Sequence, residues 1–313
     1  MSAQPSLVPQ APPDRAERAR ARFPLLRTLG RAVLSNRKAL AGASLLTIFI
    51  VMAVVPWAIA PGTPGAEIYQ PGQGASFEHL LGTTSYGQDI FTQFIWGARA
   101  SLVIAVVAGL LSTVISALVG VTSGYLGGVA DDVLALITDV FLVIPAFPIV
   151  VVIAAYSKNG GNATIIAVLV VTGWAYGARQ LRAQVLSLRS RDFLVAARLR
   201  GERTFRIVVS EILPNMTSLL VANFLGASVY AILTAAGLQF VGLGNVNTDS
   251  WGTMLYWAQN NEALQAGLPL WAIAPGIGIA LLGAAFALLN YAFDEISNPA
   301  LRTVRGRGAR SDP

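Results

Sequence analysis

Six long apolar windows constrain the fold of this 313-residue chain more than any other feature. A helix needs about 20 apolar residues to cross the hydrocarbon core of a bilayer. The windows are 39–60, 101–125, 133–156, 164–178, 217–238 and 270–293. The fourth is the shortest, and Pro145 and Pro148 lie inside the third. A bundle tolerates such breaks, because neighbouring helices and cavity water can satisfy the freed backbone groups. The sequence therefore predicts an all-α, polytopic membrane protein with six transmembrane helices.

The composition argues against a soluble domain and against chemistry within this chain. Hydrophobic residues make up 54% of the sequence and charged residues 12%, whereas a soluble domain carries roughly 25% charged residues. The chain has no Cys, which excludes disulfides and thiolate sites, and its single His79 disfavours a histidine triad or metal cluster. Neither of its two lysines follows a phosphate-binding Gly-rich loop. We therefore expect no enzymatic activity, no metal and no cofactor in this chain.

The basic residues predict how the chain is oriented. Twenty of the 22 Lys and Arg residues precede the first window, lie between 179 and 206, or follow the last window. With six spans these three segments share one side, and Lys and Arg are retained on the cytoplasmic side. Only Arg99 and Lys158 fall on the other side. We therefore expect both termini in the cytoplasm, and the basic charge indicates membrane orientation rather than nucleic-acid binding.

These signals divide the chain into four regions. Residues 1–38 form a cytoplasmic N-terminal tail, in which 23–38 is either an interfacial helix or an ordinary basic flank. Residues 39–100 hold the first span and an external loop, 101–293 form the core with a cytoplasmic loop at 179–214, and 294–313 form a cytoplasmic tail.

The loop at 179–214 carries eight arginines and the pattern AAR-x-x-G followed by ILPN. Ala196 and Ala197 favour helix, and Gly201 permits a sharp turn. Pro214 cannot continue a helix from its N-terminal side without losing a hydrogen bond, so it is predicted to mark the start of the fifth span. The loop is therefore predicted to form two short helices with a bend near Gly201, and its small residues favour close approach by another protein.

Further candidates lie inside and outside the membrane. Asp139, in the third window, either relays protons or pairs with a loop arginine; the pairing is favoured because it lies close to the interface. Trp174 and Tyr176 are candidates for lining a path through the helix bundle, and the alternative is interfacial anchoring. The predicted external loops contribute four candidates: Asp89, Arg99, Trp251 and Trp257. The two tryptophans either contact a substrate or a delivery protein, or belong to the interfacial aromatic belt.

Four blocks of the sequence resemble a known family in the same order along the chain. They are LGTTSYGQDIFTQFIWGARASL (81–102), GYLGGVADDVLALITDVFLVIP (124–145), DFLVAARLRGERTFRIVVSEILPN (192–215) and AGLQFVGLGNVNTDSWGTML (236–255). Together they resemble the membrane subunits of binding-protein-dependent ABC importers, particularly the dipeptide/oligopeptide/nickel permeases, whose EAA loop corresponds to 192–215. Val195 stands where that family has a glutamate.

The resemblance implies a type I ABC importer permease fold in the cell (inner) membrane. It implies four kinds of partner: a homologous second permease, two ABC ATPase subunits that bind ATP and Mg²⁺, an extracellular or periplasmic substrate-binding protein, and the lipid bilayer. It further implies that the EAA loop couples to the ATPases through five residues: Asp192, Ala196, Ala197, Gly201 and Pro214.

The substrate and the transporter class leave alternatives open. Peptides and oligosaccharides fit the resemblance almost equally, and a nickel permease is a further possibility within the family. From other classes, a proton- or ion-coupled secondary transporter would need an ion site in mid-membrane, for which Asp139 alone is a poor candidate. A channel or scaffold subunit would not need the EAA pattern.

Overall fold

The computed structural model describes residues 36–156 and 161–297. Within these ranges the chain is helical, and β structure is limited to an isolated bridge between Thr83 and Asp89. The long helices are α3 (Arg37–Val54), α5 (Ile90–Leu126), α8 (Asn162–Arg189), α12 (Thr217–Phe240) and α14 (Pro269–Ser297). The shorter elements are α4 (Pro56–Ile59), α6 (Gly128–Val143), α7 (Ala146–Tyr156), α9 (Asp192–Leu199), α10 (Thr204–Ile207), the π-helical turn η1 (Val208–Ile212), α11 (Leu213–Asn215) and α13 (Trp251–Asn260).

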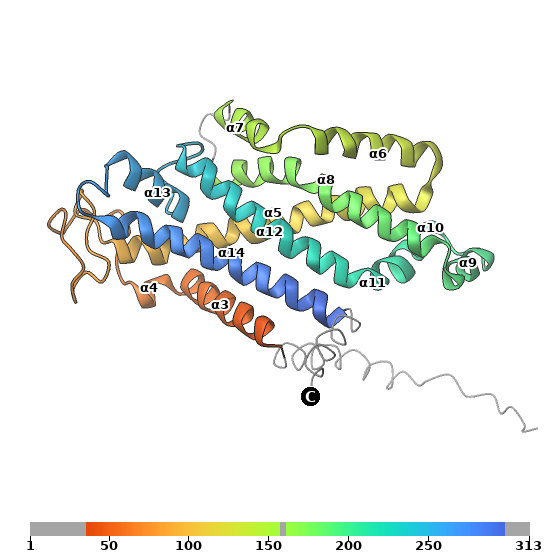
Figure 1. The fold of residues 1–313 in the computed structure, drawn as a ribbon, viewed down its shortest axis with the longest axis horizontal. Helices are drawn as coiled ribbons and strands as arrows, with labels where there is room; N and C mark the ends of the chain where they lie inside the picture. The colour runs from red at the N-terminus through yellow and green to blue at the C-terminus, as the bar shows by residue number, and fades with distance from the viewer. Residues whose placement is uncertain (1–35, 157–160, 298–313) are drawn as a thin grey trace, which may run out of the picture.

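The five long helices are each long and apolar enough to cross a membrane, and the bent pair α6–α7 brings the candidate spans to six. The long helices run side by side along the length of the molecule (Figure 1). Helices α9 and α10 lie at one end, and α13 lies at the other (Figure 1). The prediction of an all-α protein with six spans is confirmed.

Helices α5 and α8 pack closely along a row of small residues. The small residues recur at every fourth position along one face of α5, and all are buried: Ser112, Ser116, Gly120 and Gly124. Such spacing lets two backbones approach closely in a membrane bundle. The Ser116 hydroxyl donates a hydrogen bond of 2.6 Å to the carbonyl of Trp174 on α8. A Cβ on Gly120 would lie 2.4 Å from the carbonyl oxygen of Ala178, so this position excludes any side chain.

We expect Gly120→Ala to destabilise the bundle by about 1–3 kcal/mol, because one methyl group would force the α5 and α8 backbones apart. The measurement is thermal unfolding of the detergent-purified protein. Gly283→Ala on α14 is the matched control, since nothing lies within 4 Å of the added Cβ. Equal unfolding temperatures for the two variants would contradict this account of the interface.

The first predicted span, 39–60, is interrupted at Val55, where α3 ends before Pro56 begins α4. Two other helices extend well beyond their predicted spans. The predicted second span began at residue 101, but α5 begins at Ile90, where the Asp89 carboxylate caps it by accepting from the backbone N–H of Thr92. The predicted fourth span ended at residue 178, but α8 continues to Arg189. The extension is rich in good helix formers, and two of its arginines form ion pairs with α6.

The predicted third span is not a single straight helix. It divides at Ile144 into α6 and α7, which meet at 85°. Ile144 precedes Pro145 and has extended geometry, with ψ of 127°, as expected because a following proline disfavours helical geometry. The proposed interfacial helix at 23–38, apart from its last residues, lies outside the described residues, as do Lys158 and the C-terminal tail beyond Ser297.

Candidate functional site

A helical hairpin, residues 192–215, forms one end of the molecule (Figure 1). It consists of α9 followed by the continuous helical segment α10–η1–α11, so the predicted pair of short helices is present. The bend lies at Gly201, whose φ of 73° is left-handed. The N–H groups of Gly201 and Glu202 donate to the carbonyls of Arg198 and Ala197, the pattern with which glycine ends a helix.

Pro214 lies inside the second half of the hairpin rather than at the start of the following span. The helix continues through Pro214 to Asn215 and breaks at Met216, one residue before α12 begins. Proline removes a backbone donor and its ring crowds the preceding turn. The wide π turn of η1 ends at Ile212, two residues before Pro214, and loosens the turn that the proline ring would otherwise crowd.

The inner face of the hairpin packs against the ends of α5 and α8. Leu194 and Ala197 on α9 are fully buried in a cluster with Tyr125 of α5 and Val185 of α8. The guanidinium of Arg198 lies 5.2 Å from the centre of the Tyr125 ring, a cation–π contact. The inner face of the hairpin therefore belongs to the same packed cluster as the ends of two long helices.

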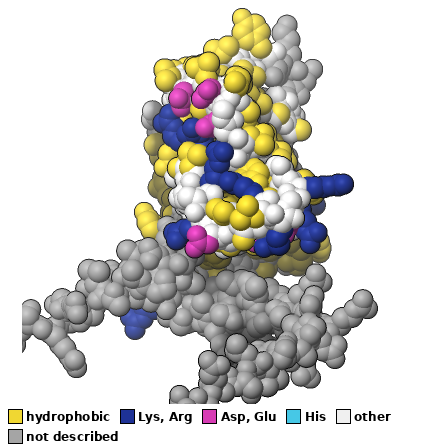
Figure 2. Space-filling view, turned by 90° about the vertical axis from the view of Figure 1, so that its right-hand side faces the viewer, with side chains coloured by type: hydrophobic (Ala, Val, Ile, Leu, Met, Phe, Trp, Pro, Cys, Tyr) yellow, Lys and Arg dark blue, Asp and Glu magenta, His cyan; other side chains and the backbone are white. Residues whose placement is uncertain are grey.

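The outer face of the hairpin exposes apolar side chains among arginines. Leu199 is 84% exposed and Phe205 is 78% exposed, while Ala196 and Asp192 also face outward. Figure 2 looks onto this end of the molecule and shows hydrophobic side chains with Lys and Arg side chains around them. Exposed apolar residues gathered in this way mark an interaction surface. The predicted coupling residues thus divide, with Ala197 on the inner face and Ala196 on the outer face.

Asp139 on α6 forms an ion pair with Arg179 on α8, and both side chains are more than half exposed. This pairing is the favoured sequence interpretation. A second pair lies one turn closer to the hairpin, where Arg182 donates to both carboxylate oxygens of Asp131 at 2.6 and 2.8 Å. Ser123 at the end of α5 also donates to Asp131. The carboxylates therefore tie α6 to α8 and α5.

A cavity of about 680 Å³ lies between the bend of α6–α7, α8 and α12. Tyr176 lines it and is 66% exposed, in keeping with its place among the translocation-path candidates. Trp174 is 7% exposed, packs against Phe141 with ring centres 5.2 Å apart, and does not line the cavity. The structure therefore places Tyr176 at the cavity and Trp174 in the core behind it.

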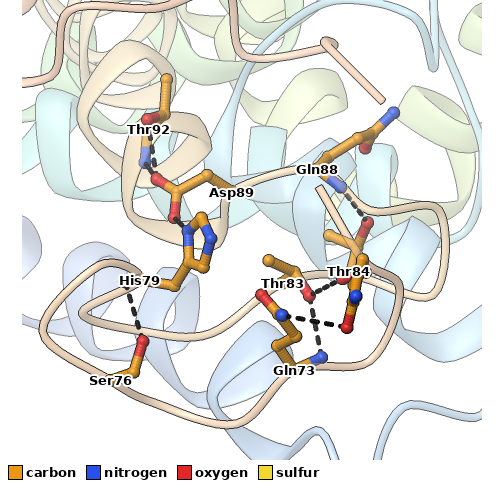
Figure 3. A network of polar contacts seen from close by, with 9 residues as sticks. Gln73, Ser76, His79, Thr83, Thr84, Gln88, Asp89 and Thr92 are labelled. Carbon is orange, nitrogen blue, oxygen red and sulfur yellow. Dashed lines mark hydrogen bonds and ion pairs between the residues drawn. The ribbon is translucent and has the colours of Figure 1, made fainter. Parts of the chain in front are cut away.

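Asp89 is a structural residue of the loop between α4 and α5. Its carboxylate accepts from the backbone and side chain of Thr92 and lies 3.0 Å from Nδ1 of His79 (Figure 3). Nearby, the Thr83 hydroxyl accepts from the backbone of Gln73, and Thr84 accepts from the backbone of Gln88 (Figure 3). These bonds fix the loop against the start of α5. Since Asp89 is 13% exposed, it positions the loop instead of offering a contact surface.

Trp251 fits neither of its two sequence interpretations, contact with a partner or a place in the interfacial belt. It is fully buried, stacks on Phe94 at 5.5 Å, and donates from its indole N–H to the Phe94 carbonyl. Its helix α13 inserts between α5 and α14, where Gly97 and Gly278 leave room for the indole. The sequence could not predict this insertion, because the residues around a tryptophan in a loop do not distinguish an interfacial position from a buried one.

Trp257 lines an outer pocket of about 420 Å³ together with Glu67, Tyr86 and Asp249. Partial desolvation raises the pKa of the Asp249 carboxyl above its ordinary value. Arg99 lies beside an adjacent hollow that Asp249 also lines. The structure thus brings Trp257 and Arg99 to the same outer region, around Asp249, a residue that the sequence did not single out.

The sequence reasoning also missed three polar residues at the 680 Å³ cavity: Asn223, Tyr230 and Asn290. Asn223 and Tyr230 fall within the fifth apolar window and Asn290 within the sixth. Polar side chains inside such windows are the signal that could have identified them.

Comparison with known proteins shows what this arrangement is similar to. Residues 116–303 match the family model described as "Binding-protein-dependent transport system inner membrane component". The oligopeptide transport system permease protein OppC of Mycobacterium bovis is 32% identical over 283 residues, which cover 90% of this chain and 96% of that protein. The dipeptide transport system permease protein DppC of Bacillus subtilis is 31% identical, over 87% of this chain and 85% of that protein.

These relatives are transport permeases rather than enzymes. The family match begins within α5 and includes every later helix, from α6 to α14, and the relatives extend the likeness over nearly all of the chain. The chain belongs to the binding-protein-dependent transport system inner membrane components, the multi-pass permease subunits of ABC importers with the type I fold.

Proposed function

We propose that this chain forms one half of the translocation path of an ATP-driven importer for peptides. The observation that carries the proposal is the hairpin 192–215, which exposes apolar residues outward and buries Leu194 and Ala197 against the long helices. A partner that binds the exposed face could move the long helices through the residues packed on the buried face. The names of the relatives, oligopeptide and dipeptide permeases, favour peptides over oligosaccharides and nickel.

The proposed complex contains a homologous second permease, two ATPase subunits and an external substrate-binding protein. ATP and Mg²⁺ would bind in the ATPase subunits. The hairpin and both termini would face the cytoplasm, because most Lys and Arg residues lie in those segments. The outer pocket beside Trp257 and Asp249 would then face the binding protein at the opposite end.

ATP would drive transport by favouring one arrangement of the bundle. A ligand shifts a conformational equilibrium only through its different affinities for the two states. ATP must therefore bind more tightly to the closed pair of ATPases, whose approach would move the two hairpins of the paired permeases. The contacts of Ala197 with the ends of α5 and α8 would pass this movement to the helices that line the path.

The direct test is uptake by the complete transporter reconstituted in proteoliposomes. We expect accumulation of a labelled peptide that requires the binding protein and ATP on the hairpin side. Uptake that follows an imposed proton gradient without ATP would favour the secondary transporter. ATP-dependent uptake of an oligosaccharide, with no uptake of any peptide, would support the ATP-driven importer but contradict the proposed peptide substrate.

Gly201→Val is expected to abolish this uptake while the chain still inserts in the membrane. The reason is conformational, because the φ of 73° is an outlier for a β-branched residue. Gly201→Asn is the matched control, since Asn tolerates left-handed geometry and nothing lies within 4 Å of the added Cβ. Uptake assays with both variants check this. Normal uptake by Gly201→Val would contradict the role of the bend.

A further inference from the structure

The cavity beside the bend of α6–α7 has a lining without charge. It contains apolar residues, several small residues and six polar side chains: Thr172, Tyr176, Gln180, Asn223, Tyr230 and Asn290. No Asp, Glu, Lys, Arg or His among the described residues lines it. A metal ion, an ammonium group or a carboxylate would therefore find no compensating charge there. The volume of about 680 Å³ is in the range of small-molecule sites.

Three of the polar residues carry atoms without a partner. Nδ2 of Asn223, the hydroxyl of Tyr230 and Oδ1 of Asn290 are each buried and form no hydrogen bond within the described chain. Only six side-chain atoms of the described residues share this property, so half of them belong to this one cavity. Buried polar groups in native proteins are nearly always paired, and exceptions call for a partner that is not present.

The positions of two of these side chains are set by close packing. A Cβ on Gly177 would lie 2.4 Å from Oδ1 of Asn223 and 2.6 Å from the Ser116 hydroxyl, so the missing side chain makes room for the carboxamide. A Cβ on Gly173 would lie 3.3 Å from the ring of Tyr230. Both glycines are on α8 and face α12, which carries Asn223 and Tyr230. The surrounding helices thus hold the polar groups at the cavity.

The broken helix adds backbone groups to the same cavity. Ile144, Pro145 and Ala146 all line it, and they form the junction where α6 ends and α7 begins. Helix ends leave carbonyl and N–H groups without intrahelical partners. Irregular backbone at membrane depth is tolerated where it lines a water-filled cavity. The lining therefore offers both donors and acceptors, and all of them are neutral.

We propose that Asn223, Tyr230 and Asn290 form an uncharged hydrogen-bonding site for the main-chain amides of a peptide in transit. This inference rests on the proposed import of peptides. A carboxamide both donates and accepts, as a peptide group does. Such a site binds the backbone, which all peptides share, and does not recognise their side chains. Peptides of different charge therefore pass at similar rates.

The test introduces a charge at the site. In the complete reconstituted transporter, wild-type uptake of Ala-Ala-Ala, Ala-Glu-Ala and Ala-Lys-Ala should agree within about threefold. Asn223→Asp should reduce uptake of Ala-Glu-Ala at least about tenfold relative to Ala-Lys-Ala, because its carboxylate repels the acidic peptide. Asn162→Asp is the matched control, since Asn162 also has a buried unpaired atom but lies outside this cavity. It should leave the relative rates unchanged.

A second pair of variants removes hydrogen bonds without adding charge. Asn223→Leu and Tyr230→Phe should lower uptake of all three peptides about five- to tenfold, with equal amounts of assembled transporter. The proposal is overturned if the wild type imports peptides while these variants stay within twofold of it and Asn223→Asp shows no charge preference. Failure of the wild type to import any peptide would instead overturn the proposed substrate.

Discussion

Replacing Phe205 with Asp is expected to uncouple the permease from its ATPase subunits. Phe205 is 78% exposed on the outer face of the hairpin, so its loss removes little packing within this chain. An acidic residue in the first turn of α10 also suits the helix dipole. In the complex, however, the substitution would place a carboxylate in an apolar contact. Loss of a central aromatic contact costs about 2 kcal/mol or more, roughly a 30-fold loss of affinity.

Co-purification of the ATPase subunits with the tagged permease measures this effect. Phe77→Asp is the matched control, because Phe77 is also strongly exposed but lies in the loop between α4 and α5, outside the hairpin. We expect Phe77→Asp to retain the ATPases and Phe205→Asp to lose both them and ATP-driven uptake. Retention of the ATPases by Phe205→Asp would show that they bind elsewhere.

The Asp131–Arg182 pair is expected to be the more important of the two ion pairs between α6 and α8. Asp131 is 14% exposed and Arg182 is 34% exposed, and the guanidinium holds both carboxylate oxygens. Removing one partner of a buried pair leaves an uncompensated charge. We expect Arg182→Gln to destabilise the folded protein by about 1–2 kcal/mol, between the costs for exposed and for buried pairs, because Asp131 is mostly covered whereas Arg182 is partly exposed.

Thermal unfolding of single and double variants distinguishes the interaction energy of the Asp131–Arg182 pair from the effect of each charge alone. Asp131→Asn combined with Arg182→Gln should recover most of the stability, since no charge is then left unpaired. Arg179→Gln provides the comparison: its pair with Asp139 is more than half exposed on both sides, so the loss should stay below about 1 kcal/mol. Similar losses for Arg179→Gln and Arg182→Gln would contradict this ranking.

The number and order of the spans could be predicted from the sequence, because apolar windows of helical length follow from the thickness of the bilayer. Their ends were less predictable. Arg179 and Arg182 end the fourth apolar window, yet both lie on α8, because a helix can continue beyond its apolar part, and both pair with carboxylates of α6. The bend at Ile144 is encoded by Pro145, but its angle depends on how α7 packs on α8 and α12.

The candidate site was predictable where its signals are local. The turn at Gly201 and the two short helices follow from residues that are close in the sequence. Which face of α9 is buried depends on its contacts with α5 and α8, so the different positions of Ala196 and Ala197 could not be foreseen. The burial of Trp251 was not predicted because it also depends on distant residues: glycines on α5 and α14 create the space for its indole.

The most direct test of the central claim is cross-linking from the outer face of the hairpin. The chain contains no Cys, so Ala196→Cys provides a single attachment point for a photoreactive maleimide before assembly with the ATPase subunits. We expect a cross-linked product that contains an ATPase subunit and whose yield changes when ATP is added, while Phe77→Cys gives no such product. Absence of any ATPase product from Ala196→Cys, in a complex that still imports its substrate with ATP, would contradict the account.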